Sequence, residues 1–298
     1  MTDRVWHELV KEQYFYSGGS LREFCRPRDE LRAEVQSFCI KSGSEVAKKL
    51  VRSFGGDRNQ NRLDRILRTY ITDPSDEVHY RRYIFWHNLV DSGYALKLLG
   101  QQIGVDKQFE LYVHAKSISA SFSGIVYELF FHHAVHQTLA TKNPVVLKLK
   151  EGSDYETITI RDSQFQCRGS SEMECYDLLT KLPKNTYWHP DYPTFPFIDA
   201  VVLCEGSKKN EGDCCSETIL AYIQLTIKNT KTFQPGRLLE LNQALDKNPN
   251  FANIRRVYVV VVPDSSTCVA FTLKNAPESE TILAMIGFFE PDKFVRQE

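Results

Sequence analysis

The chain changes its residue pattern near residue 140, and this change limits the folds that it can adopt. Before that point, apolar residues recur at spacings of three and four over residues 21–54 and 79–103, which predicts helices. A further long helix is expected over residues 115–138. After it come segments rich in Val, Ile and Thr, and one helix expected over residues 236–247. These segments predict β-strands at residues 144–150, 157–167, 197–205, 218–228, 255–264 and 268–274.

This order of elements predicts the α+β class, with an N-terminal helical region over residues 1–109 and a mixed domain over residues 110–298. Apolar residues make up 42% of the chain and charged residues 25%, which is typical of a folded globular protein. No apolar run reaches the length of about 18 residues that a membrane span needs, so no membrane partner is expected. The first residues lack the apolar core of a signal peptide.

Charge and cysteine usage narrow the class of protein further. The formal net charge of −1 argues against a strongly basic nucleic-acid coat, but it is compatible with a local basic groove. The eight cysteines include no pair spaced as CxxC, and their density is too low for a disulfide scaffold. We therefore expect reduced, mostly buried thiols in an intracellular protein.

Two expected strands are placed to form a hairpin. Residues 198–204 and 218–228 are joined by the polar, glycine-containing segment 205–217, which predicts an antiparallel pair with a long connection. If the pairing begins next to this connection, the paired residue numbers sum to 422 or 423. Asp199 then lies beside Gln224.

Side chains two residues apart share one face of a strand, so Thr226 and Lys228 are expected on the face of Gln224 and Asp199. This set suits metal-assisted phosphodiester hydrolysis, because Mg²⁺ takes oxygen ligands and lowers the pKa of an attacking water. A lysine stabilises the developing charge. Glu128, on the long helix, can supply another acid. The structural alternative is that Asp199 caps a turn and Gln224 is a solvated edge residue.

A resemblance to a known family begins at these residues. The segments "YWHPDYPTFPFIDAVVL", "ILAYIQLTIKNTK" and "GRLLELNQAL" resemble the C-terminal domain of Crinkler effectors of oomycetes and fungi. They also resemble the retrotransposon hot spot proteins of trypanosomes. The resemblance covers roughly residues 110–290. It implies a restriction-endonuclease-like domain of the PD-(D/E)XK superfamily, with a central mixed sheet flanked by helices.

The resemblance also implies roles for individual residues. Asp199 matches the metal-binding aspartate of the family, Gln224 stands where the superfamily has Glu or Gln, and Glu128 matches the acid of the first helix. Together these three would hold Mg²⁺ or Mn²⁺. The family has a lysine two residues after the Gln224 position, and here this sequence has Thr226. Lys228 and Lys231 lie just downstream, and either is a candidate substitute.

The family often carries an NTPase domain before the nuclease-like domain. The segment "YFYSGGSLREFC", residues 14–25, resembles the end of such a domain, with Arg22 as the lid arginine. The alternative is a Gly-Gly turn before a helix with a surface arginine. No GxxxxGK[ST] motif occurs, so residues 1–109 are expected to be an NTPase-lid-like remnant without ATP hydrolysis.

Basic residues follow the expected hairpin. Six basic and two acidic residues from Thr226 to Arg256 leave a local charge of +4, the sign that a phosphate backbone requires. The alternative is a solvated helix face. The candidate nucleic-acid contacts are Lys231, Arg237, Arg255 and Arg256. A second basic cluster, interpreted as surface, contains Arg58, Arg62, Arg65 and Arg68.

Histidines and aromatic residues offer weaker candidates. His132 and His136 are four residues apart and could share a metal, but a plain helix face is the alternative. Trp188 and Tyr192 could stack on bases, and core packing is the alternative that the sequence favours.

Two functional hypotheses from different classes remain. The first is a Crinkler-like effector, secreted into a host cell and nuclear, that hydrolyses DNA as an Mg²⁺-dependent nuclease. The second is a non-catalytic effector that binds DNA or a host nuclear protein. A transposon-derived or self-defence protein is a third reading, which the sequence does not separate from the second.

Overall fold

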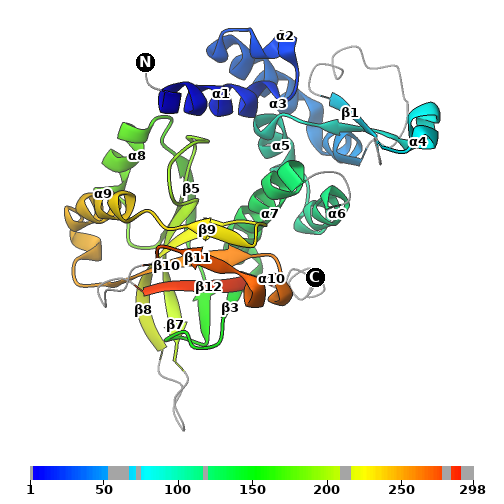
Figure 1. The fold of residues 1–298 in the computed structure, drawn as a ribbon. Helices are drawn as coiled ribbons and strands as arrows, with labels where there is room; N and C mark the ends of the chain where they lie inside the picture. Colours follow the sequence, from blue (N-terminus) through cyan, green and yellow to red (C-terminus); the bar gives the residue numbers. More distant parts are fainter. Residues whose placement is uncertain are drawn as a thin grey trace. The chain divides into compact units, whose positions relative to one another are not determined.

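The computed structural model describes residues 3–52, 67–71, 75–116, 120–208, 216–276 and 283–289. They form two compact units, Met1–Phe130 and Phe131–Glu298. The positions of these units relative to one another are not determined (Figure 1). The division falls inside helix α7, Ala120–Thr141. In the described ranges, no helix combines the length and the apolar character needed to cross a membrane.

Helices make up most of the first unit. An antiparallel strand pair, in which Leu67 lies opposite Val90, also belongs to it, so the prediction of a purely helical region is wrong here. A short apolar run such as "WHNLV" fits both the helical and the strand spacing of apolar residues. Its pairing with residues 67–71 makes it a strand. The elements are α1 (Asp3–Ser17), α2 (Leu21–Phe24), α3 (Arg28–Arg52), β1 (Leu67–Ile71), α4 (Glu77–Arg81), η1 (Tyr83–Phe85), β2 (Trp86–Val90), α5 (Gly93–Gly100) and α6 (Val105–Ala115).

The second unit is built on one mixed sheet with the strand order β4-β3-β12-β10-β8-β7-β6-β5. The α+β class is therefore confirmed. The strands of this sheet are β3 (Val145–Leu149), β4 (Thr157–Ile160), β5 (Gln164–Arg168), β6 (Thr186–Pro190), β7 (Ala200–Ser207), β8 (Ser216–Leu225), β10 (Arg255–Val262) and β12 (Leu283–Phe289). The other elements are α8 (Glu172–Leu179), β9 (Thr230–Thr232), α9 (Pro235–Asp246), η2 (Pro249–Phe251), α10 (Ser265–Ala270) and β11 (Thr272–Lys274).

The sheet also closes on itself, which the sequence did not predict. Strand β7 is long enough to pair with β6 near its start, at Trp188↔Val201, and with β4 near its end, at Ile158↔Gly206. The β4–β7 pairing joins β4, β3, β12, β10, β8 and β7 into a closed ring, from which β6 and β5 extend. The sheet is thus mixed, as expected, but it is not a simple open layer.

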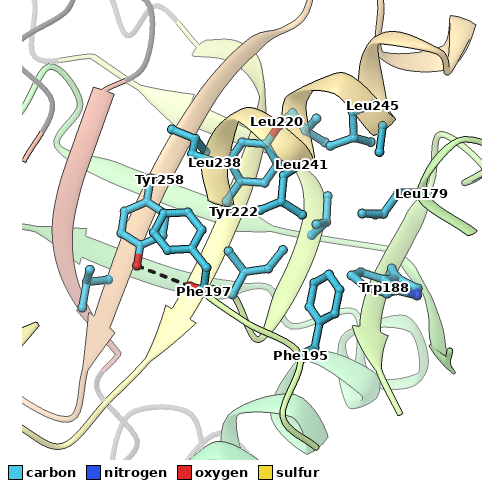
Figure 2. Close-up of a cluster of buried hydrophobic side chains, with 14 of the residues drawn as sticks. Leu179, Trp188, Phe195, Phe197, Leu220, Tyr222, Leu238, Leu241, Leu245 and Tyr258 are labelled. Carbon is cyan, nitrogen blue, oxygen red and sulfur yellow. Dashed lines mark hydrogen bonds between the residues drawn. The ribbon is translucent and has the colours of Figure 1, made fainter. Parts of the chain in front are cut away.

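Helix α9 covers one face of β8 and β10. Its side chains Leu238, Leu241 and Leu245, spaced three and four apart, belong to the buried cluster that contains Tyr222 and Tyr258 (Figure 2). Leu241 and Leu245 are fully buried. Truncating a buried leucine to alanine costs about 2–5 kcal/mol, so this layer is a main source of stability. Along the chain, α9 lies between β8 and β10, which pair in parallel.

Three local predictions differ from the structure. Residues 268–274, expected as a strand, end helix α10 and form only the short β11, because Asp264 caps the helix by accepting from Thr267 N at 2.8 Å. The strands β6, which is residues 186–190 of the aromatic segment, and β12 were not predicted. The cysteines of the described ranges are free thiols, and four of them are buried: Cys39, Cys175, Cys204 and Cys268.

Candidate functional site

The predicted hairpin register is confirmed. In the antiparallel β7–β8 pair, Cys204 lies opposite Ile219 and Ala200 lies opposite Ile223, so that the paired numbers sum to 423. The observed strands are shifted by two or three residues at their ends from the predicted ones. Asp199 immediately precedes β7, and its N–H donates to Ile223 O at 2.8 Å.

The Asp199 carboxylate is held by two amide donors. Its Oδ2 accepts from Leu225 N and from Gln224 Nε2, each at 2.5 Å. Both bonds use the same oxygen, so Oδ1 takes no part in them. The carboxylate thereby extends the β8 ladder by one bond at the point where the backbone of β7 begins. This is the cap role of the structural alternative, and it also places Asp199 beside Gln224 as the sequence predicts.

Gln224 is buried, with 5% of its surface exposed. Its Nε2 also donates to Leu225 O at 3.1 Å, so two oxygens converge on this nitrogen. The amide orientation follows from these two acceptors, since an oxygen in the same place would face two other oxygens. Two convergent oxygens are an arrangement that also suits a small cation.

The lysine candidates do not continue this face of the strand. β8 ends at Leu225, so the prediction that period two carries the face onward to Lys228 is wrong. Thr226 N still donates to Val261 O at 3.1 Å, and its Oγ1 accepts from Lys228 N at 3.2 Å, which forms a turn. The Lys228 residue is exposed. Lys231 lies in β9, opposite Leu273 of β11.

Glu128, the third expected ligand, lies on α7 in the first unit and is partly buried. Because the two units are not placed relative to each other, its role at the Asp199 site stays a prediction. On the helix itself, Glu128 is four residues before His132 and therefore lies on the same face.

The histidines of α7 point to different neighbours. His132 Nδ1 lies 2.7 Å from Tyr187 Oη, and its ring lies 3.9 Å from that of His189. His136 instead packs against Phe165, with ring centroids 5.0 Å apart. His132 and His136 therefore do not converge, and no group of three His, Cys, Asp or Glu residues in the described ranges is arranged to hold a metal.

One further residue was missed by the sequence reasoning. His189 of β6 places Nδ1 3.1 Å from the carbonyl oxygen of Asp199. It belongs to the aromatic segment that the sequence singled out, but nothing in its spacing indicates this contact. In the same segment Trp188 is buried with 1% exposure and contacts Phe195, so core packing is confirmed for it. Tyr192 also packs, partly buried, against the core.

The three candidate arginines are engaged in ion pairs. Acids distant in sequence pair with Arg237 and Arg255, whereas Arg256 pairs with an acid of the same segment, which the charge of +4 already includes. Arg255 and Arg256 also begin β10, and Arg255 lies five residues before Val260, the neighbour of Gln224, or about 17 Å away along the strand. The ion-paired partners are Glu172 and Glu240 for Arg237, Asp154 and Glu217 for Arg255, and Asp246 for Arg256.

In the first unit, the Gly-Gly segment forms a turn before a short helix. Ser20 caps α2 by accepting from Glu23 N, and Arg22 is exposed, as the surface alternative describes. Gly19 N donates to Asp91 Oδ2 at 2.6 Å. The resemblance to an NTPase lid stays a prediction. Arg58, Arg62 and Arg65 lie outside the described residues, and Arg68 belongs to β1.

Comparisons with protein-family models, with curated proteins and with solved structures gave no match to this chain.

Proposed function

We propose that the second unit is a nuclease-like domain that binds a divalent cation, Mg²⁺ or Mn²⁺, and acts on phosphodiester bonds of DNA. The observation that carries the proposal is the contact between the Asp199 carboxylate and the Gln224 amide at neighbouring strand ends. The order of elements adds support, because the strand of Gln224 leads through the Leu-rich helix α9 into the parallel strand β10. The same order underlies the resemblance to Crinkler effectors and to the restriction-endonuclease-like class.

The oxygen ligands at this site fit a weakly held Mg²⁺. Asp199 supplies a carboxylate and Gln224 an amide, and Leu225 O lies within the same hydrogen-bond network. Mg²⁺ in proteins is held by one or two carboxylates, and waters and substrate phosphates complete its shell. Gln224 would ligate through Oε1, since an amide nitrogen is no ligand, and this requires its amide to turn over from the orientation in which Nε2 faces Asp199. When bound, such a cation polarises a phosphate and lowers the pKa of a bound water.

The remaining roles in this proposal belong to residues of the chain itself. Glu128 is the proposed third ligand, and Lys228 or Lys231 the proposed contact to the scissile phosphate. The proposed contacts of Arg237, Arg255 and Arg256 with the DNA backbone require exchange of their present acidic partners for phosphates. Surface ion pairs of this kind contribute only about 0–1 kcal/mol, so exchanging them for phosphate contacts costs little free energy.

A second candidate is an effector that uses the same unit to bind DNA or a host nuclear protein without cleavage. Two observations favour it. Asp199 Oδ2 already accepts two amide hydrogen bonds, and Thr226 stands at the family's lysine position. A site in which amides satisfy the carboxylate has less need of a cation.

A plasmid-nicking assay in Mg²⁺ and Mn²⁺ tests the first proposal. Asp199→Asn keeps an acceptor for Leu225 N but removes the charge, and it should lower nicking by about 100-fold or more, because a catalytic cation contributes several kcal/mol. The control is Asp177→Asn, an exposed residue of α8, which should nick like the wild type. Equal nicking by wild type and Asp199→Asn would refute catalysis at this site.

The same preparations separate the two candidates. If no variant nicks, calorimetry with Mg²⁺ and Mn²⁺ and a DNA-binding titration decide the matter. Absent cation uptake, with DNA affinity that falls steeply as salt rises, selects binding without cleavage, because phosphate contacts release counterions. Neither uptake nor DNA affinity would reject both DNA readings.

A further inference from the structure

The backbone just before Asp199 has an unusual conformation. Phe197 has a φ of 80°, although it is neither glycine nor asparagine. A bulky residue rarely adopts positive φ, because its Cβ crowds the backbone. Such a conformation persists only where the surroundings hold it, and it occurs most often at functional sites. The question is which groups hold this segment.

Tyr258 of β10 holds the Phe197 residue. The two rings are stacked, with centroids 4.5 Å apart and an interplanar angle of 12°. The Tyr258 hydroxyl donates to Phe197 O at 3.5 Å, the contact drawn in Figure 2. Phe233 packs edge-on against both rings, at 5.2 and 5.1 Å. Because 3.5 Å is long for an O–H···O bond, the ring packing contributes more than the hydroxyl.

Tyr258 also lies close enough to Asp199 to be affected by its charge. Burial raises the pKa of the Tyr258 hydroxyl well above its ordinary value, and the negative charge of Asp199 raises this pKa further. The hydroxyl therefore stays protonated and remains a donor to Phe197 O. It cannot act as a base here.

His189 of β6 holds the other end of the segment. Its Nδ1 lies 3.1 Å from Asp199 O, and a carbonyl oxygen can only accept, so Nδ1 must carry the proton of this bond. The His189 residue has only 8% of its surface exposed, and the ring of His132 lies 3.9 Å from it. The imidazole is therefore enclosed on one side by α7 and directed at the backbone of Asp199 on the other.

We propose that His189 and Tyr258 are positioning residues, which fix the backbone from Phe197 to Asp199 so that the Asp199 carboxylate meets Leu225 N and Gln224. Two side-chain donors from different strands thus bind the carbonyls at the two ends of one three-residue segment. The functional part of this inference rests on the proposed function. His189 is expected to have the larger effect through hydrogen bonding, because its bond is the shorter of the two.

The first test measures amide hydrogen exchange at Leu225, whose N–H donates to Asp199 Oδ2. In His189→Leu, the Leu225 amide should exchange about tenfold faster, since local opening sets the rate. In Tyr258→Phe, which keeps the ring packing and removes only the long hydroxyl bond, exchange should be faster by a smaller factor. The Thr226 amide donates to Val261 O instead and should not change. His189→Asn, whose side-chain N–H can replace that of Nδ1, should restore the Leu225 amide.

The matched control is Tyr222→Phe. Tyr222 lies opposite Tyr258 in the β8–β10 register and is equally buried, but its hydroxyl donates to Asn242 and not to the segment. This variant should leave the Leu225 amide unchanged. An unaltered Leu225 amide in both Tyr258→Phe and His189→Leu overturns the positioning role, as does a nitrogen-15 spectrum that places the His189 proton on Nε2.

Nicking measured on the same variants separates this inference from the proposed function. Slower nicking by Tyr258→Phe and His189→Leu, with recovery in His189→Asn, supports both. Faster exchange at Leu225 without nicking by any protein, wild type included, supports the positioning role and rejects cleavage. If the exchange does not change while the wild type nicks, the positioning role is rejected and cleavage stands.

Discussion

The β7–β8 pair carries an acid at each of its two ends, and the two acids are held in different ways. At one end, the Asp199 carboxylate accepts from two amides, Leu225 N and Gln224 Nε2. At the other end, Glu217 accepts from Lys208 at 2.9 Å and from the Tyr155 hydroxyl at 3.0 Å. Both lie within the second unit, on the same pair of strands.

The difference concerns charge. The Lys208 hydrogen bond and, to a smaller extent, the Tyr155 hydroxyl and nearby Arg255 lower the pKa of Glu217, which stabilises its ionised form. Glu217 and Lys208 thus form a partly exposed ion pair, worth about 0–1 kcal/mol. Amide donors fix the direction of Asp199 but do not cancel its charge. The Asp199 carboxylate is thus held by amide groups, whereas the Glu217 carboxylate is held by a lysine and a tyrosine hydroxyl.

The largest expected effect concerns the pH range in which the folded protein loses stability. His133 lies on α7 next to His132, whose ring packs against that of His189. Burial, and then the neighbouring His136, lower the pKa of His133 to about 4 from an ordinary 6.5. Between pH 6.5 and 4, His133 is protonated in the unfolded chain but neutral in the folded chain. The free energy of unfolding therefore decreases as the pH falls from 6.5 toward 4, by at most about 3 kcal/mol.

Urea unfolding between pH 7.5 and 4.5 measures this loss. The variant His133→Gln has no titrating group at this position, and its free energy of unfolding should fall less steeply over the same range. Identical slopes for the wild type and the variant would show that His133 titrates normally in the folded protein.

The next effect compares removal of the two acids. Asp199→Ala leaves Leu225 N–H without its acceptor and removes one of the two acceptors of the buried Gln224 amide, and it should cost about 1–3 kcal/mol. Glu217→Ala removes a partly exposed ion pair and should cost less than about 1 kcal/mol. Urea unfolding at pH 7 gives both values. A larger loss for Glu217→Ala would contradict the comparison.

A smaller effect is expected when the amide of Gln224 is replaced by a second acid. In Gln224→Glu, two carboxylates face each other, and their repulsion raises the pKa of one of them by about one unit or more. This corresponds to a loss of stability of roughly 1–2 kcal/mol. Thermal unfolding should show a lower Tm in chelator and recovery of Tm in Mg²⁺. Gln224→Met, with similar volume and no charge, should not respond to Mg²⁺. Equal responses of both variants would argue against a cation at this position.

The smallest effect is at the Glu217 end. Because the pKa of Glu217 lies below its ordinary 4.5 in the folded protein, its stabilising effect is present above pH 4.5 and is lost as the pH falls through the lowered value. Glu217→Gln should flatten the acid limb of the stability curve by less than about 1 kcal/mol. A flattening of several kcal/mol would mean that this pair is not the weak surface contact described above.

Local patterns in the sequence were enough for several features. The periods of three and four predicted the helical segments that contain α3 and α5, and α7 and α9 were also expected. The apolar segments with a polar connection predicted the β7–β8 pairing and its register. The reason is physical: side-chain period and short-range hydrophobic pattern depend on neighbours in the chain. The contact between Asp199 and Gln224 follows from that register alone. The extension to Lys228 failed because the pattern does not report where the strand ends.

Long-range contacts decided the remaining features. Arg255 donates a hydrogen bond to Asp154, which is 101 residues away in the sequence, and Tyr258 donates to the Phe197 carbonyl, which is 61 residues away. The closure of the sheet through β4 and β7 is of the same kind. Such contacts depend on how the whole unit packs, and no local period encodes them. The residues along the chain thus specify which acid and amide stand side by side, whereas packing of the whole unit sets their orientation and which charges remain to meet a ligand.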